Sequence, residues 1–322
     1  MSSNVNFMKG KLNMEKEKRT NSIQAVGTIE ELNFNIETKK VTLKGNGKEK
    51  EVTCKQIGKK NFSSPNVTIK VNDSIVGFNF YPTNEKKLDE DGNVVDNPRF
   101  KAIQTISEYE KGTRVKVDGT FANSEYPTES GEFKSFTQLY AFNMTSTGVG
   151  DEDYCDGSLG GYINKIKTEM KDERETGRKI VEFLYLNNNG DIFPMNLILD
   201  KDLVRAFEEM YSKGDSAVLD IECVTRTVGT TEKKTSGFGR ESHRTSGYTV
   251  TEFKIFGGGK ALKEENPNYI SKSDVEKKLE ERDVMIEQKI KDKKSSNKKG
   301  FTEKNDNEFV KVENDIDDPF GD

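Results

Sequence analysis

The sequence Lys-Gly-Thr-Arg-Val-Lys-Val-Asp at residues 111–118 returns, in altered form, as Lys-Gly-Asp-Ser-Ala-Val-Leu-Asp at residues 213–220. Each copy follows a segment whose apolar residues have helical spacing, Phe100–Glu110 in the first case and Asp200–Tyr211 in the second. In each copy the glycine predicts the end of that helix, and the alternating apolar residues after it predict a strand. The repeat therefore predicts two similar units in one chain.

Predicted strands surround each copy of the repeat in the same order. The second half also contains Asn187-Asn188-Asn189-Gly190 between two β-rich runs, and an Asn-Gly turn in that context is a strong hairpin signal. Each half reads as three strands, a helix and two strands, which is the order of the OB-fold, a five-stranded barrel. We expect a mainly β fold with two tandem OB-like barrels and short helices; two small β domains of another topology are the alternative. The β-rich segments are 23–29, 41–43, 52–54, 67–71, 115–117 and 139–141, then 160–163, 179–186, 191–199, 216–220 and 250–256.

Polar and charged segments lie before, between and after the two predicted barrels. Ser273 and Glu276 form a capping-box pattern that begins a predicted C-terminal helix with a thin apolar stripe. Such a helix could pack on the barrels, pair with a second chain in self-association, or lie in water. The predicted division is a flexible basic arm (1–21), a first OB-like domain (22–147), a linker (148–158), a second OB-like domain (159–262), a helical segment (263–293), and a disordered linker and acidic tail (294–322).

Composition restricts the possible functions. The last eighteen residues hold seven acids and one base; without them, the chain's 51 bases and 56 acids become 50 and 49, so the net charge of −5 belongs to the tail. The sequence has no apolar run of eighteen residues and no apolar N-terminal stretch, so we expect a cytoplasmic protein without a membrane partner. The three cysteines are far apart, and the single histidine, His243, has no patterned nucleophile nearby. We therefore expect no catalytic residue, no metal and no cofactor.

OB barrels bind ligands on the face of strands two and three, under the loops that join strands one to two and four to five. In the second half the latter loop runs over residues 225–247 and is long, basic and rich in glycine. Bases neutralise phosphates and aromatic rings stack on nucleotide bases, so this composition predicts a nucleic-acid contact. A disordered hairpin tip is the alternative. The candidate residues are Arg226, Lys233, Lys234, Phe238, Arg240, Arg244 and Tyr248.

Aromatic residues on the predicted strands are further candidates for stacking on bases. Phe183, Tyr185 and Phe193 flank the Asn-rich turn of the second half. The first half offers Phe78, Phe80 and Tyr81, and for every one of these rings packing in the barrel core is the alternative. Tyr185 is the preferred candidate because it lies next to the turn.

The acidic tail ends in a hydrophobic anchor. Its residues Ile316, Asp317, Asp318, Pro319 and Phe320 resemble the acidic tip of bacterial and phage single-stranded DNA-binding proteins, in which aspartates precede a Pro-Phe pair. In the bacterial family that phenylalanine is usually the last residue, whereas two more residues follow it here. The resemblance implies that the tail docks on replication or recombination proteins and competes with DNA. An acidic tail that only adds solubility is the alternative.

The whole chain thus resembles a bacterial or phage-encoded single-stranded DNA-binding protein. That resemblance implies binding without sequence preference during DNA replication, recombination or repair. A protein-interaction scaffold or virion component built on OB barrels and an RNA-binding factor are the alternatives.

Overall fold

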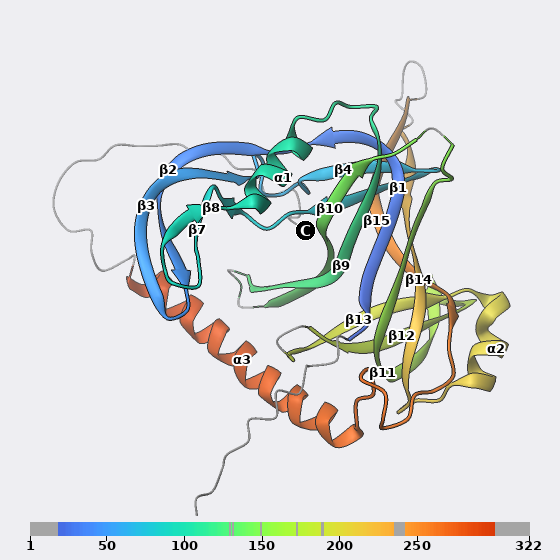
Figure 1. Cartoon of the computed structure of the whole chain (residues 1–322). Coiled ribbons are helices and arrows are strands. Elements are labelled where there is room, and N and C mark those ends of the chain that lie inside the picture. The colour runs from blue at the N-terminus through green and yellow to red at the C-terminus, as the bar shows by residue number, and fades with distance from the viewer. Residues whose placement is uncertain are drawn as a thin grey trace, which may run out of the picture.

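The computed structural model describes residues 19–299 except 129, 131, 149, 172, 188, 189 and 235–241, and within 226–249 and 295–299 it describes the backbone alone. In these residues the fold is mainly β, with two closed five-stranded barrels, two short helices and a long C-terminal helix (Figure 1). The predicted fold class is confirmed. The predicted acidic tail lies outside the described residues.

The first barrel closes as a ring in the order β1-β4-β5-β10-β9-β1. Only β5 and β10 run parallel. Along the chain α1 (Pro98–Ser107) follows β5 and precedes β9, the third and fourth barrel strands in sequence order. This is the strand order and helix position of an OB barrel. Its strands are β1 (Asn21–Leu32), β4 (Val67–Val71), β5 (Ser74–Asn79), β9 (Arg114–Pro127) and β10 (Phe133–Ser146).

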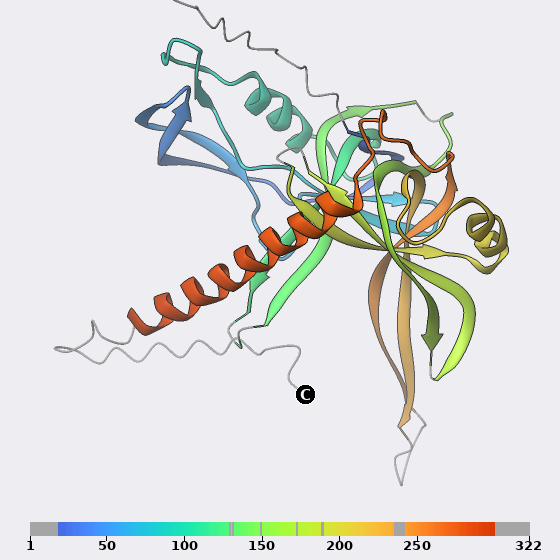
Figure 2. The same cartoon turned by 90° about the horizontal axis from the view of Figure 1, so that it is seen from below.

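The second barrel repeats the arrangement in the order β11-β12-β13-β15-β14-β11, with β13 and β15 parallel. The predicted hairpin at the Asn-rich turn is the one that joins β12 to β13. Beyond the barrel, β14 and β15 continue as a long two-stranded arm (Figure 2). The elements are β11 (Tyr154–Lys171), β12 (Arg174–Leu186), β13 (Ile192–Leu199), α2 (Lys201–Met210), β14 (Ser216–Lys234) and β15 (Ser242–Gly258).

The sequence repeat marks the same corner in both barrels. Gly112 donates its backbone N–H to the Ile29 carbonyl at 2.9 Å, and Gly214 donates to the Ile163 carbonyl at the same distance. Both glycines have a positive φ, +90° and +103°, which other residues adopt only with strain. The repeated glycine therefore ties the helix exit to the first strand of its own barrel.

Two segments outside the barrel form separate sheets, one between β1 and β4 and the other between β5 and α1. β2 (Asn35–Gly45) and β3 (Lys48–Gly58) make a hairpin that pairs with the short β6 (Thr83–Asn84). The strands predicted at 41–43 and 52–54 exist, but they belong to this hairpin and not to the barrel. Alternating apolar residues show only that one face of a strand is buried, here through Leu43 and Cys54. They do not show which sheet the strand joins. A second small sheet pairs β7 (Lys86–Leu88) with β8 (Val94–Asp96).

One strand joins the two barrels. β1 pairs with β9 along one edge, and along its other edge residues 21–26 pair with residues 154–159 of β11. At this seam a Cβ on Gly157 would lie 2.5 Å from the Ser22 carbonyl and 2.8 Å from the Phe121 ring, so only glycine fits. The second half of the predicted linker, residues 154–158, is thus a strand that holds the barrels together.

The N-termini of α2 and of the C-terminal helix are held by different contacts. Asp200 stands at the N-cap of α2, but its side chain makes no cap hydrogen bond. Its carboxylate instead accepts from Lys254 Nζ and pairs with Arg178 Nε, each at 3.1 Å. In the C-terminal helix α3 (Lys272–Lys299), Ser271 accepts from the Asp274 backbone N–H at 3.1 Å. The capping box predicted at Ser273 is therefore wrong, because Ser271 already fills that role.

The α3 helix begins on the second barrel. Val275 is buried and packs with Ile270, Tyr162, Leu184 and Ile192. From there α3 lies across the β9–β10 hairpin of the first barrel (Figures 1 and 2). It continues to Lys299, so residues 294–299, predicted to be a disordered linker, are helical. None of the helices in the described ranges combines the length and the apolar character needed to cross a bilayer.

Candidate nucleic-acid interface

Two stacked tyrosines lie on the outer surface of the first barrel. Val76 and Phe78 of β5 and Phe80 just beyond it are buried, whereas Tyr81, two residues past the end of the strand, is 54% exposed. Its ring stacks on that of Tyr140 with centroids 4.3 Å apart and planes 21° from parallel. Burial, and then the proximity of Tyr81, raise the pKa of Tyr140, so the Tyr140 hydroxyl remains neutral at physiological pH. The pair is a rigid aromatic platform with one face open to solvent.

A third ring reaches the same surface from β10. Leu139 and Ala141 point inward and are buried, so Phe142, like Tyr140, lies on the outward parity of the strand and is 58% exposed. The register with β9 shifts between Ala141 and Asn143, so that Asn143 is exposed as well and Met144 returns to the core. Alternation in the first part of β10 therefore sets the direction of Phe142.

Two cavities meet at Tyr81, and we call them together the Tyr81 cleft. One, of about 480 Å³, contains Phe142, Arg19 and Phe193. The other, of about 530 Å³, lies between the β2–β3 hairpin and the start of α1. Among the described residues five bases and no acid line the two cavities, so the cleft is electropositive. The bases are Arg19, Lys44, Lys86, Lys87 and Arg99.

The bases of the cleft differ in how they are compensated. Lys44 pairs with Glu49 at 2.7 Å, and Lys86 pairs with Asp96 at 2.6 Å. Within the described part of the chain, neither Lys87 nor Arg99 has a carboxylate within ion-pair distance. Those two side chains are exposed and able to neutralise an anionic ligand without first breaking an ion pair.

A second aromatic groove, of about 350 Å³, lies at the base of the β14–β15 arm. The buried amide of Asn33 donates to the carbonyls of Asn61, Ser64 and Pro65, which fixes a loop that presents Phe62 at 87% exposure. Lys59 lines the same groove, and burial lowers its pKa. The groove therefore offers an exposed ring and a cation close to the arm.

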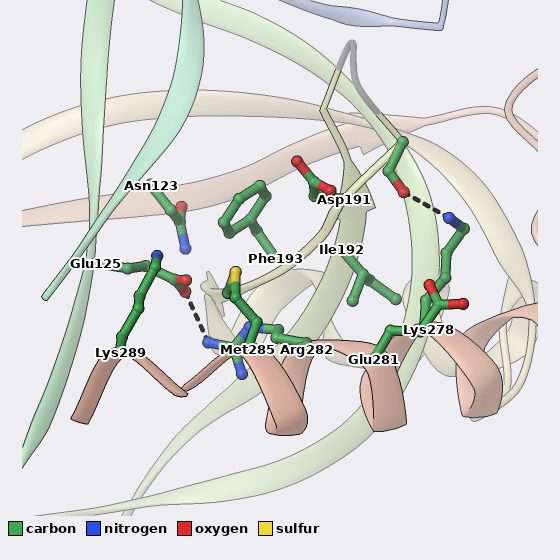
Figure 3. A pocket seen from close by; sticks show the side chains of 11 residues that line it. Asn123, Glu125, Asp191, Ile192, Phe193, Lys278, Glu281, Arg282, Met285 and Lys289 are labelled. Carbon is green, nitrogen blue, oxygen red and sulfur yellow. Dashed lines mark hydrogen bonds and ion pairs between the residues drawn. The ribbon is translucent and has the colours of Figure 1, made fainter. Parts of the chain in front are cut away.

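A third cavity, of about 600 Å³, lies beneath α3 (Figure 3). Lys278, Arg282, Met285 and Lys289 line it from one face of the helix, and Arg282 pairs at 2.6 Å with Glu125 of β9. The Glu125 side chain is only 3% exposed, so this ion pair is buried. Figure 3 shows Phe193 opposite the helix, and Phe193 also lines the Tyr81 cleft, so the two spaces are adjacent.

The family model that matches this chain is YorF, over residues 19–296. The chain belongs to the YorF family. Among solved structures it is similar to a deletion mutant of the single-stranded DNA-binding protein from Thermus aquaticus, at 12% identity and a TM-score of 0.41, covering 78% of this chain and 99% of that one. The wild-type Thermus aquaticus protein gives 11% identity, a TM-score of 0.39, and coverage of 76% and 95%. No curated protein matches the YorF-family chain in sequence.

The structure separates the aromatic residues that the sequence suggests as candidates. Phe183 and Tyr185 are 0% and 1% exposed, and the Tyr185 hydroxyl donates to Asn123 Oδ1 at 3.0 Å, so both rings are core residues, the alternative left open above. Burial raises the pKa of Tyr185 far above its ordinary value. Phe193 is half-buried and faces two cavities. Of the candidates in the first half, only Tyr81 is at the surface.

The predicted basic loop of this YorF-family protein is mostly a two-stranded arm. Arg226 pairs opposite Val250, Lys233 opposite His243, and Tyr248 opposite Val228. Lys234 and Arg244 also lie on the arm, whereas Phe238 and Arg240 are outside the described residues. The tail candidates Ile316, Asp317, Asp318, Pro319 and Phe320 are outside them as well.

Sequence reasoning missed most of the residues that the structure brings together in the cleft. Phe142 lies just beyond the β-rich segment predicted at 139–141, and which parity of that segment faces outward depends on its pairing in the barrel. Lys87 lies between β5 and α1, where no strand was predicted, and Arg99 lies at the start of α1, one residue before the predicted helical segment. A usable signal was the alternation over residues 139–141, which places Tyr140 on the face opposite Leu139 and Ala141.

Proposed function

We propose that this YorF-family protein binds single-stranded DNA in the Tyr81 cleft without reading its sequence. The observation that supports this proposal is the lining of the cleft, with five bases, no acid among the described residues, and the exposed rings of Tyr81 and Phe142. Bases along a groove follow the phosphate backbone, and aromatic rings stack on successive bases whatever their identity. Such a site needs neither a catalytic residue nor a cofactor.

The finer role that we propose is in DNA replication, recombination or repair. The acidic tail would bind partner proteins of those processes through Ile316–Phe320 and compete with DNA for the basic cleft. Support for this part comes from the sequence of the tail, with its clustered acids and Pro-Phe pair. The β14–β15 arm, with its bases and Tyr248, would extend the contact surface for the strand.

A fluorescence-anisotropy titration of labelled single-stranded DNA tests the binding proposal, with duplex DNA and single-stranded RNA as competitors. The informative variant is Lys87→Gln with Arg99→Gln, which removes two cations of the cleft. Each lost phosphate contact lowers the slope of log affinity against log salt by about 0.7, so the pair should lower it by about 1.4. Lys201→Gln with Arg205→Gln is the matched control, because these exposed bases belong to α2 of the second barrel.

Each outcome of the titration has a definite meaning. Salt-sensitive binding that the cleft variant weakens and the α2 control leaves unchanged would support the proposal. Equal loss in both variants would refute a specific site at the cleft, and preferential competition by RNA would change the ligand class. A version that ends at Lys304 tests the tail, because its removal should tighten DNA binding if the tail competes with DNA.

A further inference from the structure

The inner face of α3 has charged residues where an amphipathic helix usually has apolar ones. Lys278, Arg282 and Lys289 recur at intervals of four and seven residues, so they share the face that lines the third cavity. Met285 is the apolar residue between them. Figure 3 shows this face turned toward Phe193 and Asn123. Cations that line a cavity are solvated by water, paired with acids or matched by an anionic occupant.

The acids around the cavity are already engaged. Glu125 accepts from Arg282 and from the Ser135 hydroxyl, and Asp191 accepts from the Asn187 amide. Glu281 pairs with Lys277, one helical turn earlier, at 4.0 Å. The charges lining the cavity are formally balanced, three bases to three acids, but each acid has its own hydrogen-bonding or ionic partner.

The two lysines of this face have neutral partners. Lys278 donates to the Gly190 carbonyl at 2.6 Å, and Lys289 lies 5.9 Å from the centre of the Phe133 ring. Within the described ranges neither lysine pairs with a carboxylate. The side chains at 278 and 289 therefore present ammonium groups without a carboxylate partner to a cavity of about 600 Å³.

The cavity is adjacent to the Tyr81 cleft. Asn123 and Phe193 line both spaces, so a chain-like ligand leaving the cleft past Phe193 would arrive beneath α3. The Phe193 ring, half-buried against Tyr185 with centroids 6.0 Å apart, offers a surface on which a base could stack at this junction. A polyanion is the class of ligand that fits both the extended shape and the two lysines, which have no carboxylate partner among the described residues.

We propose that the cavity beneath α3 is a second segment of the DNA-binding path, in which Lys278 and Lys289 contact phosphates of the strand that continues from the Tyr81 cleft. This inference rests on the proposed function and adds α3 as an element that covers the bound DNA. The buried Arg282–Glu125 ion pair holds α3 on the first barrel. Short oligonucleotides that fill only the cleft would not contact α3, whereas longer ones would.

The test compares two lengths of oligothymidylate on the full chain. One OB barrel occupies about 4–16 nucleotides, so about 6 nucleotides should remain in the cleft and about 25 should also reach α3. The variant is Lys278→Gln with Lys289→Gln. With the long strand its salt slope should be lower by about 1.4, so that between about 50 and 200 mM salt the unaltered chain loses about sevenfold more affinity than the variant. With the short strand the two slopes should agree.

Lys277→Gln with Lys291→Gln is the matched control, since it removes two exposed lysines from the same helix but not from the inner face. Circular dichroism and thermal melting establish that all versions are folded. If the inner-face variant and the control give the same slope with the long strand, the α3 segment is refuted while the cleft stands. If the unaltered chain binds neither length, the proposed function fails and this inference fails with it.

Discussion

Tyr81 offers the sharpest test of the cleft, because its contribution can be estimated from its surroundings. One face of the ring is covered by Tyr140 at 4.3 Å, and the side chain is 54% exposed, so one face is free for one base. A base–aromatic stack contributes about 1–3 kcal/mol by alanine substitution. Taking about 2 kcal/mol, Tyr81→Ala should raise the Kd for single-stranded DNA roughly thirtyfold.

The chain contains no tryptophan, which provides a direct optical assay. Tyr81→Trp keeps an aromatic ring at the platform and adds the single tryptophan of the protein, whose emission should be quenched when a base stacks on it. Quenching of tryptophan emission in the Tyr81→Trp variant reports whether a base stacks at this position. Anisotropy titration of the Tyr81→Ala variant reports the Kd for single-stranded DNA. The expected results are strong quenching at saturation and affinity close to that of the unaltered chain for Tyr81→Trp.

Loss of the tyrosine pair will also cost some stability, about 0.5–1.5 kcal/mol, so folding of the Ala variant must be verified by thermal melting. Phe256→Ala is the matched control, because Phe256 is 49% exposed but lines a groove against α2 on the second barrel. Binding by folded Tyr81→Ala within twofold of the unaltered chain would refute the reasoning. Unquenched emission from the Trp variant bound to DNA would do so independently.

Three further predictions concern stability and are measured by chemical or thermal unfolding. Arg178→Met should lower the free energy of unfolding by about 2–3 kcal/mol, because the guanidinium is 19% exposed and lies 2.8 Å from the buried Glu252 carboxylate; an equally stable variant would contradict this. Gly157→Ala should lower the free energy of unfolding by about 1–3 kcal/mol, because the added Cβ would clash at the seam. A change below about 0.5 kcal/mol, which is the scatter of neutral surface substitutions, would show that the seam relaxes. Burial, then Glu222 and Asp220, raise the pKa of Asp156. Because the pKa is higher in the folded state, the protonated carboxyl favours the folded state over the unfolded one. This contribution to stability is lost as the pH rises through the folded-state pKa. Asp156→Asn should therefore raise Tm at neutral pH, and the gain should vanish below about pH 4, near the ordinary Asp pKa; a gain that persists in acid would contradict the assignment.

The repeat made the barrels predictable from the sequence because the same local constraint acts twice. A helix must stop and the chain must return to the first strand, and in both halves a glycine with positive φ does this while donating to an isoleucine carbonyl. That requirement is local, so it is visible in the order of residues. The hairpin at the Asn-rich turn was predictable for the same reason.

The site was less predictable because its direction and neighbours depend on pairing between distant segments. Phe183 and Phe142 both lie on β-strands, yet Phe183 is fully buried and Phe142 is exposed, because the sequence does not state which face of each strand meets a core. Lys87 comes from the segment between β5 and α1, where the sequence predicted no element, and Arg99 comes from the first turn of α1. In the sequence the α3 helix is only weakly amphipathic, because its inner face is partly charged. That this charged face packs on the first barrel is visible only in the structure, where Arg282 pairs with Glu125.

The seam between the barrels also determines how the cleft can work. The cleft combines Tyr81 of the first barrel, Phe193 of the second and Arg19, which lies two residues before the shared strand β1. Because β1 pairs with β9 on one edge and with β11 on the other, these parts belong to one continuous sheet and not to two bodies on a flexible linker. A ligand then binds a preformed surface and does not have to order two domains, which lowers the entropic cost of binding. Damage to the seam, as in Gly157→Ala, should for this reason weaken DNA binding even though Gly157 does not line the cleft.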